Sequence, residues 1–131
     1  MKTWEMLFIR ANSGNLDRCP AYSLRDNAEI VVNRMQNYWN GQTGKNWGLS
    51  HRHTGLVIHA HWVFRTRKAA LAFADSLEDI PAWRQLPRSA CKPSGFNMSA
   101  VELQTLSDEV RRRYEALTAD VVTEQDSEQA K

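Results

Sequence analysis

Strand-forming and helix-forming segments alternate along the chain, and their order limits the folds that it can adopt. Residues 2–11 are continuously apolar at their centre and rich in strand formers, which is typical of a buried strand. Residues 12–20 contain Asn, Ser, Gly and Pro and predict a loop. Residues 46–53 and 56–64 predict two further strands, joined by a tight turn at Thr54-Gly55.

This predicted hairpin brings specific side chains together. Trp47 would lie opposite Trp62, and Leu49 opposite Ala60, so that these pairs share one face of the sheet. A single long, bent strand is the alternative interpretation of the same residues.

Two helices are predicted in the first two thirds of the chain. Ser23, followed by Asp26, is typical of a helix N-cap and predicts a helix over 24–40 that ends at Gly41. Thr66 predicts the cap of a second helix over 67–79, and Pro81 would follow its end. Its expected buried stripe is Ala70, Phe73, Ala74 and Leu77.

A loop and a long helix are predicted to complete the chain. Residues 82–98 are rich in Pro and Gly and read as a loop, with a short edge strand somewhere in 88–97. Ser99 and Glu102 then form a capping box, which predicts a helix that ends near Asp120. The expected apolar stripe of this helix is Leu103, Leu106, Val110, Tyr114 and Leu117.

The resulting order is strand, helix, strand, strand, helix, weak strand, helix. This order predicts an α+β fold, a ferredoxin-like antiparallel sheet with helices on one face and an extra C-terminal helix. We expect a single domain over 1–120 and an acidic, disordered tail over 121–131.

Charge is distributed unevenly along the chain. The net charge is +2, but residues 1–113 carry 16 basic and 10 acidic residues, whereas residues 114–131 carry 1 basic and 5 acidic. A basic body favours an anionic partner, either nucleic acid or an acidic protein surface; an ordinary solvated surface is the alternative. No apolar run is long enough for a transmembrane helix, and the first residues lack the apolar core of a secretion signal, so we expect a cytoplasmic protein with Cys19 and Cys91 reduced.

The histidines are the one cluster with metal-binding chemistry. His59 and His61 are spaced i, i+2, so on a strand both would face one side, where two imidazoles can bind a divalent metal. The run Leu56-Val57-Ile58 followed by His59-Ala60-His61 resembles the His-hydrophobic-His motif of the HUH endonucleases, which nick single-stranded DNA. That resemblance implies a metal at His59 and His61 and a nucleophilic Tyr114.

Each of these residues also has a structural interpretation. His51 and His53, another i, i+2 pair, and His59 and His61 can be core, interface or surface residues of strands. Tyr114 fits the apolar stripe of its helix. The HUH pattern also lacks a Lys shortly after Tyr114 and an evident third metal ligand.

Cations and tryptophans predict a contact surface. Cations beside the positive N-terminus of the second predicted helix, where they are unfavourable for stability, suggest a bound anion. Trp39 and Trp83 are candidates for exposure, and tryptophan and arginine dominate binding hot spots. The predicted binding residues are Arg65, Arg67, Lys68, Trp83, Arg84, Arg88, Arg111 and Arg112. Arg111 and Arg112 are alternatively explained by their place near a helix C-terminus.

The second half of the chain resembles another family. His61-Trp62-Val63-Phe64, followed by an Ala-rich segment from Thr66 to Ala74 with a central Phe73, resembles the RraB-type inhibitors of ribonuclease E. The acidic character and Gly-Trp-containing end of that family are missing here. The resemblance implies a ferredoxin-like regulator without a catalytic site. We therefore expect a non-enzymatic regulatory or inhibitory protein, without a cofactor, whose partner is a nucleic-acid-processing enzyme or its complex, with direct nucleic-acid contact as a further option. Such a protein can be a host regulator or a counter-defence protein of a mobile element. A metal-dependent HUH-type nuclease is the alternative.

Overall fold

The computed structural model describes residues 1–10, 13–36, 43–58 and 64–129. The chain divides into two units, Met1–Asn97 and Met98–Lys131. The first unit holds a four-stranded sheet and one α-helix, and the second holds a single long helix.

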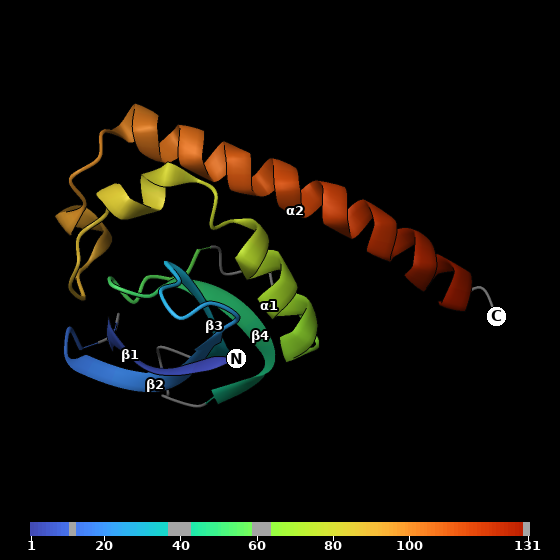
Figure 1. Ribbon diagram of the computed structural model, residues 1–131, viewed down its shortest axis with the longest axis horizontal. Helices are drawn as coiled ribbons and strands as arrows, with labels where there is room; N and C mark the ends of the chain where they lie inside the picture. The colour runs from blue at the N-terminus through green and yellow to red at the C-terminus, as the bar shows by residue number, and fades with distance from the viewer. Residues whose placement is uncertain (11–12, 37–42, 59–63, 130–131) are drawn as a thin grey trace. The chain divides into compact units, whose positions relative to one another are not determined.

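The first unit begins with an antiparallel meander. Strands β1 (Lys2–Ile9), β2 (Leu16–Ser23), β3 (Ile30–Gln36) and β4 (Thr43–His51) are hydrogen-bonded in the order of the sequence. Figure 1 shows the four strands together, with α1 against the sheet. The α+β class is therefore confirmed, but the ferredoxin-like order is wrong, because no helix separates the first strand from the others.

The helix predicted over 24–40 is replaced, over its described residues, by a turn and β3. Ile30, Val31 and Val32 are all buried, so this central part of the strand has no alternation of apolar and polar positions. Ala28, Val31, Val32 and Met35 imitate helical spacing, but the β-branched run favours a strand. Residues 37–40 of the predicted helix lie outside the described residues.

Ser23 ends β2 and does not begin a helix. Its hydroxyl accepts a hydrogen bond from Trp4 Nε1 at 2.9 Å and donates one to the Arg25 carbonyl at 2.5 Å. The Ser23 hydroxyl, which was predicted to cap a helix, therefore links β1 to the turn after β2 through these two hydrogen bonds.

The loop predicted over 12–20 is largely β2. This strand pairs with β1 along its whole length, from Ile9 opposite Leu16 to Lys2 opposite Ser23. On its other side β2 pairs with β3 only at Tyr22, opposite Val32. Pro20, which predicted the loop, therefore lies where β2 has no pairing with β3 and tolerates a missing N–H donor.

The chain reverses after β4, as predicted at Thr54-Gly55. Gly55 has φ +73° and donates its N–H to the His51 carbonyl at 2.8 Å. The returning segment forms isolated bridges from Val57 to Ser50 and from Phe64 to Trp47. Trp47 thus pairs with Phe64, so its predicted pairing with Trp62 is wrong; Ala60 and Trp62 lie outside the described residues.

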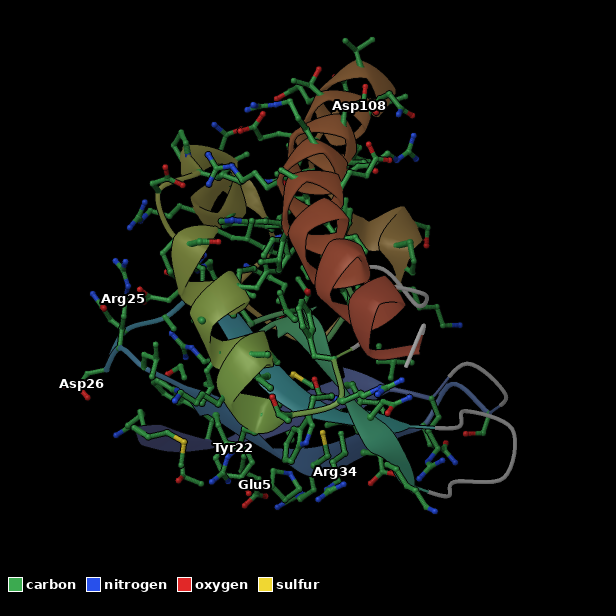
Figure 2. The ribbon with its side chains drawn as sticks, turned by 90° about the vertical axis from the view of Figure 1, so that its right-hand side faces the viewer. Glu5, Tyr22, Arg25, Asp26, Arg34 and Asp108 are labelled. Atoms are coloured by element: carbon green, nitrogen blue, oxygen red, sulfur yellow. The ribbon has the colours of Figure 1, made fainter. Side chains whose placement is uncertain are left out.

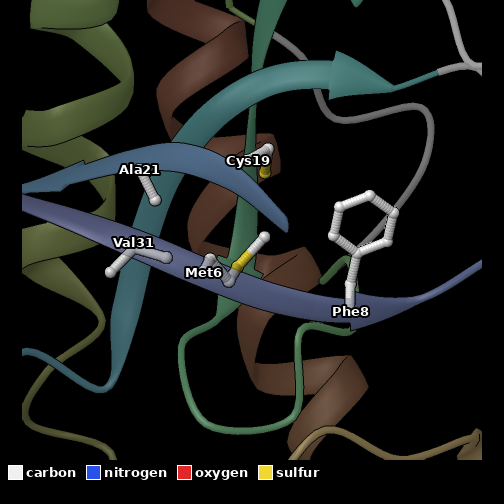
Figure 3. Packing of buried hydrophobic residues seen from close by; sticks show 5 residues of the cluster. All are labelled: Met6, Phe8, Cys19, Ala21 and Val31. Atoms are coloured by element: carbon white, nitrogen blue, oxygen red, sulfur yellow. The ribbon is translucent and has the colours of Figure 1, made fainter. Parts of the chain in front are cut away.

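One hydrophobic cluster covers one face of the sheet, to which alternate residues of β1 and β2 point. It consists of Met6, Phe8, Cys19, Ala21 and Val31, with Trp4 packed against it. Figure 3 shows the five buried side chains gathered between the strands. Cys19 is part of this core, and burial raises the pKa of its thiol to about 11.

Helix α1 (Arg67–Ser76) covers part of the sheet from the other side. Thr66 caps it, as predicted, by accepting a hydrogen bond from Ala69 N at 3.2 Å. The predicted stripe is buried, and Phe73 packs against Phe64 with ring centroids 5.6 Å apart. The helix ends at Ser76, earlier than predicted, with Leu77 as its C-cap.

Two short 3₁₀ helices follow, η1 (Pro81–Gln85) and η2 (Pro93–Gly95). Residues 88–97 form bends and η2, so the edge strand predicted there is wrong. In the second unit, α2 (Ala100–Gln129) begins at the predicted capping box. Ser99 N donates a hydrogen bond to the Glu102 carboxylate, and Glu102 N donates one to the Ser99 hydroxyl. The helix includes residues of the segment predicted as a tail, and the domain limits 1–120 and the disorder of that tail stay predictions. None of the described helices combines the length and the apolar character needed to span a bilayer.

Candidate functional site

Tyr22, Arg34, Trp47 and Arg67 form a cation–aromatic surface, and they come from four different elements. Tyr22 pairs with Val32, and Arg34, two residues later on β3, pairs with Trp47 on β4. Directly paired residues and residues two apart on a strand share a face, so these three side chains lie on one side of the sheet. Arg67 opens α1, which covers the same side. Figure 2 shows Tyr22 and Arg34 on the sheet near the first turn of α1.

The two guanidinium groups lie over the two aromatic rings. The Tyr22 and Trp47 rings meet edge to face, with centroids 6.0 Å apart. The Arg34 Cζ atom is 4.5 Å from the Trp47 centroid, and the Arg67 Cζ atom is 4.9 Å from the Tyr22 centroid and 5.8 Å from that of Trp47. The rings are half-buried and both arginines are exposed. Each cation–π contact stabilises this arrangement by about 0.5–1 kcal/mol at an exposed position.

Further cations surround this surface. Lys45 lies on β4, where its carbonyl accepts a hydrogen bond from Arg34 at 3.0 Å, and Arg65 and Lys68 flank Arg67. The first turn of α1 contains no acidic residue. Within the part of the chain that the structure describes, Arg65, Arg67 and Lys68 form no ion pair. Their charges, together with the helix N-terminus, give this region a positive field.

The other predicted contact residues, Trp83, Arg84 and Arg88, do not form a shared exposed surface with Arg67, because Trp83 is buried and Arg88 is paired with Glu29. Trp83 is only 3% exposed, so its predicted exposure is wrong. Its indole N–H donates to the Leu77 carbonyl at 2.9 Å, and its ring stacks on that of His51 with centroids 6.3 Å apart. Arg84, on η1, is exposed. The Pro-flanked loop that suggested exposure is instead a turn of 3₁₀ helix that carries Trp83 into the core.

Arg88 belongs to a charge cluster around the buried carboxylate of Glu29, which we define as Glu29, His51, His53 and Arg88. Its guanidinium donates to both oxygens of Glu29, at 2.7 and 2.8 Å. The Nε2 atoms of His51 and His53 each lie 3.5 Å from one of the same two oxygens. Both Nε2 atoms are buried without a hydrogen-bond partner, whereas His51 Nδ1 lies 3.0 Å from the Thr54 hydroxyl.

Burial and charge act in opposite directions on these groups. Burial alone would raise the pKa of Glu29, but the hydrogen bonds and charge of Arg88, with smaller contributions from the histidines, lower it. Burial lowers the pKa of His51 to about 4, although Glu29 opposes that shift. Burial, then Arg52 and Arg88, lower the pKa of His53. At neutral pH the cluster therefore consists of a carboxylate, a guanidinium and two neutral imidazoles.

The surroundings of Glu29 hold the cluster in place. The Glu78 carboxylate accepts hydrogen bonds from the backbone N–H groups of Glu29 and Ile30, at 2.8–3.1 Å. Arg52 donates to the Ala28 carbonyl at 2.7 Å and lies over the Trp4 ring at 4.1 Å. His51 is thus a core residue, one of the structural roles predicted for it, and His53 is partly exposed. The side chain of Arg88, 49% exposed, reaches the same carboxylate from the surface.

The nuclease interpretation rests on residues that the structure leaves largely undescribed. His59 and His61 lie outside the described residues. Tyr114 is half-buried on α2, and burial raises its pKa. Arg111 and Arg112 are exposed on the same helix, with Arg112 paired to Glu109 at 2.6 Å. Among the described residues no group of three His, Cys, Asp or Glu side chains can hold a metal ion.

Comparison of the chain with protein-family models, with curated proteins and with solved structures finds no match. The sequence did not indicate Tyr22, Arg34 and Trp47 as partners of Arg67, because Tyr22 lies between the predicted loop over 12–20 and the predicted helix over 24–40, and Arg34 lies within that helix. A correct assignment of β2 and β3 would have revealed them, since the strand register alone places Arg34 beside Trp47.

Proposed function

We propose that this chain is a small, non-enzymatic regulatory or inhibitory protein that binds a nucleic-acid-processing enzyme, or the complex that such an enzyme forms, through the cation–aromatic surface. The observation that carries this proposal is the stacking of exposed Arg34 and Arg67 on Trp47 and Tyr22. Arg65 and Lys68, on either side of Arg67 in the sequence, have no acidic partner among the described residues. An anionic partner surface is favoured, because it would compensate Arg65, Arg67 and Lys68, which form no ion pair with any residue that the structure describes.

The geometry supports binding for two reasons. An arginine that already lies flat on a ring loses less side-chain entropy when a partner binds it than a freely rotating one does. Its planar edge keeps N–H donors directed away from the ring, and a carboxylate or phosphate can accept two of them in parallel. Aromatic and arginine side chains together are also the residues that most often dominate binding energy.

The class of partner rests on the resemblance of the second half of the chain to RraB-type regulators, and on the basic surface. Nucleic-acid-processing enzymes that use divalent metals hold them with acidic residues, and nucleic acid bound to such an enzyme is itself anionic. The predicted residues Arg65, Arg67 and Lys68 lie at this surface, and Arg34, Lys45, Tyr22 and Trp47 extend it. The HUH-type nuclease, with a metal on His59 and His61, stays a prediction that no described contact favours.

Affinity capture with charge-reversed variants tests the proposal. Arg34→Glu and Arg67→Glu should each lower recovery of a nucleic-acid-processing partner from cell extract, measured by quantitative mass spectrometry. Lys2→Glu is the matched control, because Lys2 is exposed but lies on the other face of the sheet. Thr3 pairs with Tyr22 and shares its face, and Lys2, one residue earlier on β1, points to the opposite face. Equal recovery by wild type and both surface variants would rule out this surface.

A further inference from the structure

A groove of about 600 Å³ lies on the first unit, away from the residues of the cation–aromatic surface. It is formed by the end of β1, by the segment after the His51–Gly55 turn, and by the segment that contains η2. Its lining includes Ile9, Arg10, Leu56, Val57, Lys92 and Phe96. Its volume is within the range, about 300–1,000 Å³, that small-molecule sites of proteins occupy.

Backbone contacts hold the three walls of the groove together. Gly55 approaches β1 so closely that a Cβ atom there would overlap the Leu7 carbonyl and lie 2.7 Å from Phe8 Cα. Cys91 N donates to the Thr54 carbonyl at 3.3 Å, which joins the second wall to the third. Two hydrogen bonds of the η2 turn, from Gly95 N to Lys92 O and from Phe96 N to Pro93 O, fix the third wall. The groove is thus built by the fold and not by the positions of long surface side chains.

The lining combines apolar walls with a single uncompensated cation. Ile9, Leu56, Val57, Pro93 and Phe96 supply side chains that would gain from removal of water. Arg10 also borders the groove, but its charge is compensated by Asp17 at 2.5 Å. Lys92 is exposed and forms no ion pair with any residue that the structure describes. Its ammonium lies beside the β1–β2 turn, 3.8 Å from where a Cβ on Gly14 would be.

We propose that this groove binds an amphiphilic carboxylate, a molecule with an unbranched apolar chain and one anionic head group. The chain lies along Leu56, Val57 and Phe96, and the carboxylate accepts hydrogen bonds from the Lys92 ammonium. Charge complementarity selects an anion, because Lys92 has no acidic partner among the residues that the structure describes, and the nearby Asp17 is neutralised by Arg10. This site is independent of the cation–aromatic surface, so either can fail without the other.

Isothermal titration with decanoate, decanol and decylamine, below their aggregation concentrations, tests the proposal. Decanoate should bind with saturation at one molecule per chain, and decanol and decylamine should bind at least about tenfold more weakly, because they lack the anion. Lys92→Glu should weaken decanoate binding by a similar factor. Lys2→Glu, which makes the same charge change at the other end of β1 from the groove, should leave it unaltered.

A second readout keeps the proposal testable if heats are small. Cys91 lines the groove and is half-buried, whereas Cys19 is buried in the core, so alkylation by a maleimide should reach Cys91 first. Bound decanoate should slow this alkylation in wild type and in Lys2→Glu, but not in Lys92→Glu. Equal binding of the three compounds, no saturation by decanoate, or full binding by a folded Lys92→Glu protein would each overturn the proposal.

Discussion

Arg88 donates two parallel hydrogen bonds to the buried carboxylate of Glu29, across 59 positions of the sequence. The pair joins the start of β3 to the segment after η1, so it fastens a region without regular secondary structure to the sheet. A buried carboxylate without its cation is far less stable than the pair.

Removal of the cation should therefore destabilise the fold. Arg88→Met keeps the apolar stem but leaves Glu29 uncompensated among neutral imidazoles, and we expect a loss of about 2–4 kcal/mol in the free energy of unfolding. Urea denaturation measures it. The double variant Glu29→Gln/Arg88→Met should recover part of the loss, because no buried charge remains. A loss below about 0.5 kcal/mol in Arg88→Met would show that solvent, and not Arg88, compensates Glu29.

Because His51 is buried, we expect the stability of the fold to depend on pH. The pKa of His51 is about 4 in the folded protein and about 6.5 in the unfolded chain, so between these values the unfolded chain binds more protons. Stability should therefore fall as the pH is lowered from about 7 to about 4, by about 3 kcal/mol from His51 alone. The lowered pKa values of His53 and Glu29 act in the same direction.

Urea denaturation at a series of pH values checks this prediction. His51→Gln is the comparison variant, because Gln preserves a polar side chain but does not titrate. Its stability should change less between pH 7 and pH 4 than that of the wild type. A smaller pH dependence should remain from the other charged and titratable groups around this position, which are Arg52, Arg88, Glu29, Glu78 and His53. Identical pH profiles of wild type and His51→Gln would contradict the assignment.

Two glycines with the same backbone conformation should differ in their tolerance of alanine. Gly14 and Gly55 both have φ +73°, which costs any other residue about 1 kcal/mol. Among the described residues, a Cβ on Gly14 would meet the flexible Lys92 side chain alone, whereas one on Gly55 would overlap the backbone of β1 at Leu7 and Phe8. We expect Gly14→Ala to cost about 1 kcal/mol and Gly55→Ala more than about 2 kcal/mol by thermal denaturation. Equal losses would mean that β1 and the turn are not in contact.

The aromatic platform gives a prediction separate from charge reversal. Trp47→Leu keeps an apolar side chain but removes the ring on which Arg34 and Arg67 lie. We expect weaker partner binding by about tenfold, through faster dissociation, with the unfolding free energy lowered by about 1 kcal/mol or more. Surface plasmon resonance with the recovered partner measures both rates. Unchanged dissociation would show that the arginines bind without their aromatic supports.

The elements that are determined by residues close together in the sequence could be predicted from it. The strand over 2–11, the Thr66 cap of α1 and the capping box of α2 follow from side chains within a few positions of one another. The order of the first half could not be obtained in this way. Ile30, Val31 and Val32 are buried on both sides of the sheet, and a strand of that kind carries the same residues as a buried helical face.

The candidate site was predictable only in part, for the same reason. Arg65, Arg67 and Lys68 stand out because cations at a helix N-terminus are unfavourable unless an anion is present. Their aromatic neighbours are contributed by β2 and β4, and no spacing in the sequence indicates that Tyr22 and Trp47 meet. Trp83 was misplaced because Pro81 suggested a surface loop, whereas the hydrogen bond to Leu77 turns its ring inward.

The central claim is that the cation–aromatic surface binds an anionic partner, and one comparison tests it most directly. Wild type, Arg34→Glu/Arg67→Glu and the control Lys2→Glu should be immobilised at equal density, each shown to be folded by its thermal transition, and used to capture proteins from the same extract. We predict that wild type and Lys2→Glu recover the same nucleic-acid-processing enzyme, and that the double variant recovers at least about tenfold less of it. Undiminished recovery by the double variant, or no such enzyme with the wild type, would contradict the account.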